Sequence, residues 1–160
     1  MAAELALRDP AHAAEIVQDQ FGRFQNADRK ARFAFAMPAL SNDSRVRDRF
    51  FESLGDVNNR RHEAWVLDAV RYLHHPLRAA ASKRYVPRAL ALTREIQDTG
   101  DIFFPKRWAD ATLSGYQSVQ TAAEVRTFID RLPEDYPPRL RGVLLASADP
   151  LFRAARLLNQ

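Results

Sequence analysis

Apolar side chains recur every three or four residues along most of this chain, which is the spacing that predicts amphipathic helices. The clearest stripe is formed by Trp65, Val66, Ala69, Val70 and Leu73. No segment alternates convincingly between apolar and polar residues as a half-buried strand does, and the best candidate, residues 143–146, is too short. The pattern therefore predicts an all-α protein.

Prolines and capping residues divide this pattern into separate helices. An aspartate followed by a proline favours a helix start, which we expect at Asp9 and again at Asp149. The helix that begins near residue 27 is expected to stop near Pro38, because a proline disfavours helical geometry in the residue before it. A long helix is expected over 82–99. Further starts are expected at residues 42–44, at Ser118 and at residues 137–138.

The predicted helices form antiparallel pairs joined by short turns. The first helices of successive pairs start near Asp43, Ser82 and Ser118, so the starts are separated by 39 and 36 residues. This is the period of HEAT-like helical hairpins. The layout predicts a HEAT-like right-handed α-solenoid segment, organised as a single helical domain over residues 1–160.

Composition and charge narrow the class of protein. Of the 160 residues 46% are apolar and 28% charged, which is typical of a globular domain. The net charge of +4 comes mainly from arginine, since only three of the 24 basic residues are lysine. Acidic residues are interleaved with the arginines, as in residues 45–52, whereas a nucleic-acid binder clusters its basic residues on one face. A basic solenoid that binds nucleic acid is therefore the least favoured interpretation.

The residue content of the chain excludes cysteine-based sites and argues against a membrane span or a signal peptide. The chain has no cysteine, so it has no disulfide, thiolate metal site or cysteine nucleophile. No apolar run approaches the roughly 20 residues of a membrane span, and the N-terminal residues do not resemble a signal peptide. These observations leave the cellular compartment open.

The candidate catalytic and metal-binding groups are poorly arranged. His74 and His75 are adjacent, whereas two zinc ligands on one helix are normally four residues apart, so a helix C-terminus is the better interpretation. Glu134 and Asp135 precede a predicted helix, where carboxylates stabilise the helix dipole. We expect no catalytic residue and no metal site in this chain.

The least generic stretch lies between Gly100 and Gly115 and reads GDIFFPKRWADATLSG. We expect its aromatic residues Phe103, Phe104 and Trp108 to belong to the core. The alternative is that they line a concave surface. In that case Arg71, Lys106 and Arg107 are the candidate substrate-binding residues, presented to an anionic group such as a peptide carboxylate.

Two phrases carry a resemblance to a known family. They are RYLHHPLR (71–78) and EIQDTGDIFFPKRWADATLSG (95–115), and both look like the C-terminal helical domain of bacterial M1-family zinc aminopeptidases. Three more segments, 32–56, 62–78 and 136–155, are similar to the same region. The resemblance covers roughly residues 30–158.

The resemblance implies a supporting role. The family's HExxH helix, its downstream zinc-binding glutamate and its Gly-x-Met-Glu-Asn segment do not occur here, so no catalytic or zinc-binding residue is carried over. The resemblance implies that this chain is a fragment of a longer aminopeptidase. The fragment alone would not be an enzyme and would hold no cofactor, because the zinc would belong to the parent's catalytic domain. Its partners would be that domain and the peptide substrate. The alternative is a free-standing helical-repeat scaffold that binds a protein.

Overall fold

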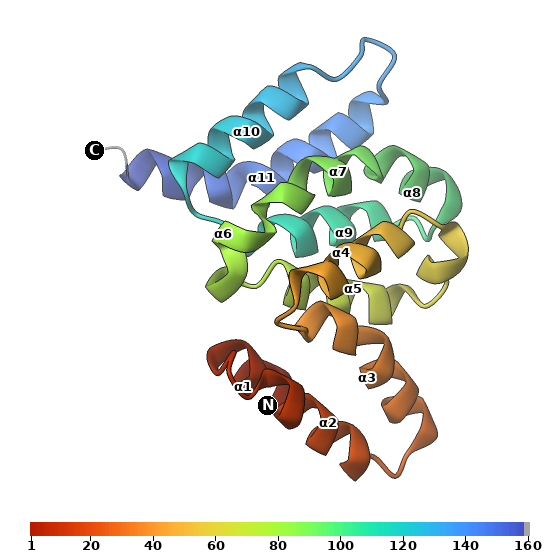
Figure 1. Ribbon diagram of the computed structural model, residues 1–160. Helices are drawn as coiled ribbons and strands as arrows, with labels where there is room; N and C mark the ends of the chain where they lie inside the picture. Colours follow the sequence, from red (N-terminus) through yellow and green to blue (C-terminus); the bar gives the residue numbers. More distant parts are fainter. Residues whose placement is uncertain (159–160) are drawn as a thin grey trace. The chain divides into compact units, whose positions relative to one another are not determined.

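The computed structural model describes residues 1–158, which contain eleven α-helices, three short 3₁₀ helices and no strand. The prediction of an all-α protein is confirmed. The chain divides into two compact units, one from Met1 to Leu73 and one from His74 onward (Figure 1). No helix in residues 1–158 combines the length and the apolar character that a membrane crossing requires.

The N-terminal unit is built from two packed helix pairs. Helix α1 packs against α2, and α3 packs against α5. Leu7, Val17 and Leu40 are among the buried side chains that join α1, α2 and α3. The elements of this unit are α1 (Ala2–Arg8), α2 (Ala13–Arg23), α3 (Ala27–Leu40), α4 (Ser44–Ser53), η1 (Val57–Arg60) and α5 (Glu63–Leu73).

The C-terminal unit surrounds α9, which packs against α7, α8 and α11. Helices α10 and α11 lie side by side as a hairpin (Figure 1). Leu90, Leu113 and Leu144 lie in the buried cluster that joins these helices. The elements are η2 (Pro76–Arg78), α6 (Ala79–Ser82), η3 (Lys83–Tyr85), α7 (Val86–Ala91), α8 (Thr93–Thr99), α9 (Phe104–Leu113), α10 (Val119–Asp130) and α11 (Pro138–Leu158).

The predicted helix start at Asp9 is wrong by several residues. Asp9 directly follows α1, and α2 begins only at Ala13. The carboxylate of Asp9 instead accepts a hydrogen bond from the backbone N–H of His12 and pairs with its imidazole. Residues 10–12 turn the chain between the two helices, so they are not available for α2.

Two prolines that were expected to bound helices lie inside them. Pro38 lies in the last turn of α3, and Pro150 lies within α11, which is continuous over 21 residues. A proline in a helix interior removes one backbone hydrogen bond. Burial of the α11 face on both sides of Pro150, which includes Ala148 and Leu151, offsets that loss.

The long helix expected over 82–99 is divided into η3, α7 and α8. Ser82 is buried and does not cap a helix with its side chain. Pro87 is the second residue of α7, a position where its missing N–H has no intrahelical partner to lose. The caps at Asp43 and Ser118 are confirmed, because their side chains accept backbone hydrogen bonds from Arg45 and Thr121.

Three arginines satisfy the C-terminal carbonyls of preceding helices. The guanidinium of Arg47 donates to the carbonyl of Ser41, 2.7 Å away, just after α3. Arg60 donates to a carbonyl after α4, and Arg141 donates to the Ile129 carbonyl of α10 at 3.1 Å. A cation is favoured at this end of a helix because the unpaired carbonyls carry partial negative charge.

The turn after α9 depends on a close approach between two backbone segments. A Cβ atom built on Gly115 would lie 1.7 Å from the carbonyl oxygen of His74, far inside van der Waals contact. Only glycine allows the backbone to approach this closely. The contact fixes the end of α9 against the segment that opens the C-terminal unit.

We therefore expect Gly115→Ala to destabilise the protein by about 2 kcal/mol or more, because the added methyl group forces the backbone of His74 to move. Gly142→Ala is the matched control. Gly142 lies inside α11, and no atom lies within 4 Å of the position that its Cβ would take, so this change should stabilise the helix by about 0.5–1 kcal/mol. Urea denaturation of both variants measures the two effects, and equal stabilities would contradict the structural argument.

Candidate functional site

The stretch between Gly100 and Gly115 forms a tight turn followed by α9. The carboxylate of Asp101 accepts a hydrogen bond from the backbone N–H of Phe103 at 2.8 Å, and the Asp101 carbonyl accepts one from Phe104 at 2.9 Å. Pro105 is the second residue of α9, where its missing N–H costs little. These local bonds set the orientation in which α9 enters the unit.

The buried face of α9 is aromatic. Phe104 and Trp108 are 1% and 0% exposed and meet edge to face, with ring centroids 6.2 Å apart. The indole N–H of Trp108 donates to the carbonyl of Ala89 at 2.8 Å. The expectation that these two residues belong to the core is confirmed. It is wrong for Phe103, which is 60% exposed because it precedes the helix and lies outside its buried face.

The predicted binding residues Lys106 and Arg107 lie on the outer side of α9. The ammonium of Lys106 donates to both carboxylate oxygens of Asp110, at 2.5 and 2.6 Å. The guanidinium of Arg107 lies over the ring of Phe103, 5.6 Å from its centroid. Both cations therefore have partners within one turn of the helix, and both remain partly open to solvent.

A groove of about 470 Å³ borders this turn. Its lining includes the side chains of Ile102, Phe103, Lys106, Arg139 and Val143. Ile102 and Phe103 expose apolar surface beside the two cations. The groove thus combines Lys106 with Arg139, and Arg107 is outside its lining.

The electrostatics of the groove favour an anion. Arg139 lies in the first turn of α11, where the helix dipole is positive, and that turn contains no acidic residue. Within the described residues, the Arg139 side chain has no ion-pair or hydrogen-bond partner. A carboxylate bound here would pair with Arg139 beside the Lys106–Asp110 ion pair, and an adjoining apolar side chain could cover Phe103.

Sequence reasoning missed Arg139. The sequence feature that could have indicated Arg139 is its position one residue after Pro138. This position puts an arginine at the N-terminus of a predicted helix, where the helix dipole disfavours a positive charge. That signal says only that a negative partner is favoured. Its proximity to Lys106 follows from the packing of α11 against α9.

The third predicted binding residue, Arg71, belongs to α5 in the N-terminal unit. Its guanidinium lies 3.4 Å from the carboxylate of Asp68, which also pairs with Arg32 of α3. This is an exposed network on the surface of one helix pair. Arg71 and the groove at Arg139 belong to different units.

The two histidines follow α5, and His74 is buried whereas His75 is half-buried. The Nδ1 atom of His74 and the hydroxyl of Tyr116 share a hydrogen bond of 2.6 Å, and the imidazole is 1% exposed. Burial lowers the pKa of His74 to about 3, and burial also raises the pKa of Tyr116. His75 accepts a hydrogen bond from the backbone N–H of Leu77 and so caps η2. The contact between His74 and Tyr116 is a packed structural one without access to solvent.

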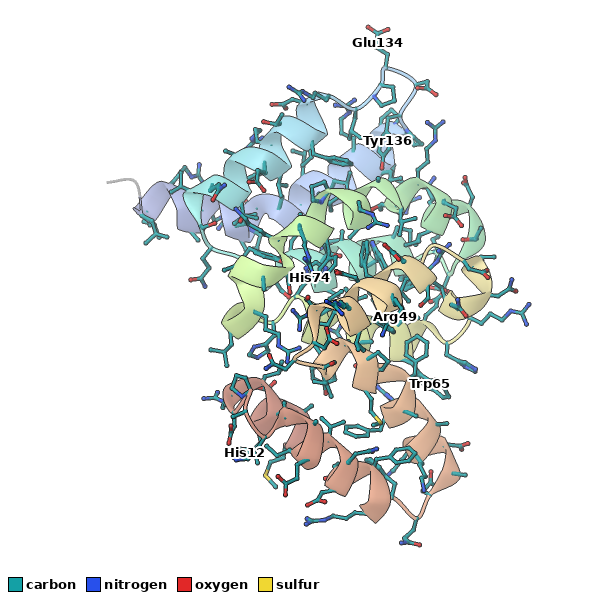
Figure 2. The ribbon with its side chains drawn as sticks, viewed as in Figure 1. His12, Arg49, Trp65, His74, Glu134 and Tyr136 are labelled. Carbon is teal, nitrogen blue, oxygen red and sulfur yellow. The ribbon has the colours of Figure 1, made fainter. Side chains whose placement is uncertain are left out.

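The remaining acidic groups do not converge. Glu134 lies at the tip of the loop between α10 and α11 and points away from it, as Figure 2 shows. Asp135 pairs with Arg94 at 3.1 Å. In residues 1–158 no three His, Asp or Glu side chains are grouped closely enough to hold a metal ion.

Comparison with known proteins adds no relative: no family model, no curated protein and no solved structure matches this chain.

Replacing Trp108 with alanine should cost about 3–5 kcal/mol of unfolding free energy, because it empties a fully buried site and leaves the Ala89 carbonyl without its donor. Phe103→Ala is the matched aromatic control and should change stability by less than about 0.5 kcal/mol, since Phe103 is exposed. Thermal and urea denaturation compare the two. A Trp108→Ala variant as stable as the parent would contradict the assignment.

Lowering the pH should destabilise the protein through His74. An unfolded histidine has a pKa near 6.5, and the folded value is about 3, so below pH 6.5 the unfolded state binds more protons. The stabilisation that the uncharged His74 gives the folded state is fully present above about pH 6.5. As the pH falls towards 3, the free energy of unfolding decreases by at most about 1.4 kcal/mol per pH unit. An NMR titration of the imidazole resonances should show His74 uncharged at pH 5, whereas exposed His12 titrates above 6.5 because Asp9 raises its pKa. A His74 midpoint near 6.5 would refute this.

Proposed function

We propose that this chain is the non-catalytic C-terminal helical domain of an M1-family metallo-aminopeptidase. In that role it covers the active-site chamber of the catalytic domain and helps to admit or bind the peptide substrate. We further propose that its helix pairs continue as a HEAT-like right-handed α-solenoid segment. The zinc and the catalytic residues belong to the parent's catalytic domain.

The observation that carries this proposal is the run of family-like phrases, above all RYLHHPLR (71–78) and GDIFFPKRW (100–108). The all-helical architecture of residues 1–158 is consistent with such a domain. The groove at Lys106 and Arg139 adds a site of suitable chemistry, since it pairs cations with exposed apolar side chains. A peptide's C-terminal carboxylate and its last apolar side chain match those two features.

The natural reading frame tests the identity. An HExxH motif with a downstream glutamate, encoded upstream in the same frame, is the expected result. A stop codon directly before Met1 would contradict it and would favour the alternative, a free-standing helical-repeat scaffold that binds a protein partner. Zinc analysis and an aminoacyl-anilide assay of the isolated chain add a second check, because tightly bound zinc with turnover would also refute the proposal.

The groove's role is tested in the full-length enzyme. Lys106→Ala and Arg139→Gln should raise KM for peptides with a free C-terminal carboxylate about 3- to 10-fold, while C-terminally amidated peptides change little. Arg153→Gln is the matched control, since Arg153 forms an exposed ion pair with Asp149 elsewhere on α11. Equal effects on free and amidated peptides would contradict carboxylate recognition. Arg107→Ala and Arg71→Ala extend the same comparison to the other two predicted binding residues.

A further inference from the structure

A second and larger groove, of about 810 Å³, lies on the C-terminal unit between α7 and α10. Its volume falls within the range of about 300–1,000 Å³ that is typical of small-molecule sites. The lining includes Pro87 and Ala91 of α7 and Phe128 of α10. Phe128 packs one side against the core and leaves the other side facing the groove. The walls are therefore mainly apolar.

Charged side chains also line this groove. Arg94 is already engaged, since it pairs with Asp135 at 3.1 Å and lies 6.0 Å from the centroid of the Tyr136 ring. Arg131 also lines the groove, and its side chain has no ion-pair or hydrogen-bond partner within residues 1–158. One acid, Glu124, is present and lies 4.0 Å from Lys83. Among the described residues that line the groove, Arg131 is therefore the cation without a partner, and a bound anion can neutralise it.

The wall also contains an unsatisfied polar group. Tyr136 lines the groove and is only 5% exposed, yet its hydroxyl has no hydrogen-bond partner in the described part of the chain. Figure 2 shows Tyr136 in the loop that joins α10 to α11. An unpaired buried hydroxyl is costly, and a carboxylate oxygen is an acceptor that satisfies both a phenol and a guanidinium.

We propose that the groove between α7 and α10 binds a small amphiphilic carboxylate, a molecule with one anionic head and a hydrocarbon or aromatic body. The head pairs with the free guanidinium of Arg131 and accepts from the Tyr136 hydroxyl after a small movement of that ring. The body covers Ala91, Phe128 and the neighbouring apolar wall. A single charge matches one free cation, and Glu124 disfavours a doubly charged phosphate. This proposal does not depend on the aminopeptidase assignment.

Decanoate, used below its critical micelle concentration, is the probe. An NMR titration of the 160-residue chain should give saturable shifts of backbone amides in α7 and α10. Decanol, which has the same hydrocarbon chain without the charge, should bind about tenfold more weakly, the effect expected for one charge-assisted hydrogen bond. Absence of saturable binding, or equal affinities for the two probes, would overturn the proposal.

Four variants locate the site. Arg131→Gln should lower the affinity for decanoate about tenfold, whereas Arg126→Gln, inside α10 and over the Phe152 ring, should leave it unchanged. Tyr136→Phe deletes only the hydroxyl and should weaken binding several-fold while leaving the free protein at least as stable. Ala91→Phe fills the groove from an exposed position and should abolish binding.

Two results would refute the site assignment. Decanoate binding that survives Ala91→Phe would place the ligand elsewhere. Saturable binding of an acidic helical peptide in this groove without any binding of decanoate would reassign it as a protein-docking surface. Circular dichroism of each variant confirms that a lost signal reflects binding and not unfolding.

Discussion

The close approach of Gly115 to the carbonyl of His74 is the contact on which the C-terminal unit depends. With no Cβ at Gly115, the turn after α9 lies directly against the chain at His74. That packing buries the imidazole of His74 beside Tyr116 and Tyr85, where it stays uncharged because charging it without solvent is costly. Helix α9, which ends here, supplies Trp108 to the core and Lys106 to the groove. The turn at Gly115 thus holds the C-terminal end of the helix that contributes to both the core and the candidate site.

Arginine serves a structural purpose in this chain that explains part of its basic charge. Arg47, Arg60 and Arg141 each direct a guanidinium to the carbonyls at the end of a preceding helix. Arg47 and Arg60 are buried to more than 90%. A planar guanidinium suits this role because it can donate to several carbonyls in one plane. The guanidinium groups of these three arginines already donate to backbone carbonyls, whereas Arg131 and Arg139 line the two grooves.

Pro150 shows that tertiary packing can override a local helix-start signal. Asp149 and Pro150 have the sequence of a helix start, yet α11 continues through them. A local cap contributes about 1 kcal/mol, and burial of Leu144, Ala148 and Leu151 along one helical face contributes several times more. Residues 82–99 show the reverse case. Their continuous helical pattern predicts one helix, whereas the folded chain forms the three short elements η3, α7 and α8 there. Of the residues that line the groove at α9, the sequence pattern singled out Lys106 but not Arg139, and it wrongly placed Phe103 in the core.

The sequence by itself determined the all-α class, most helix faces, the caps at Asp43 and Ser118 and the burial of Trp108, because these follow from periodicity and from bonds within one turn. Tertiary structure alone decided that Lys106 and Arg139 share a groove, that Arg131 has no partner among the described residues and that the buried Tyr136 hydroxyl has none there either. Those properties depend on which helices pack together. No local pattern encodes the distance between side chains about thirty residues apart, since that distance is set by the shape and volume of the whole core.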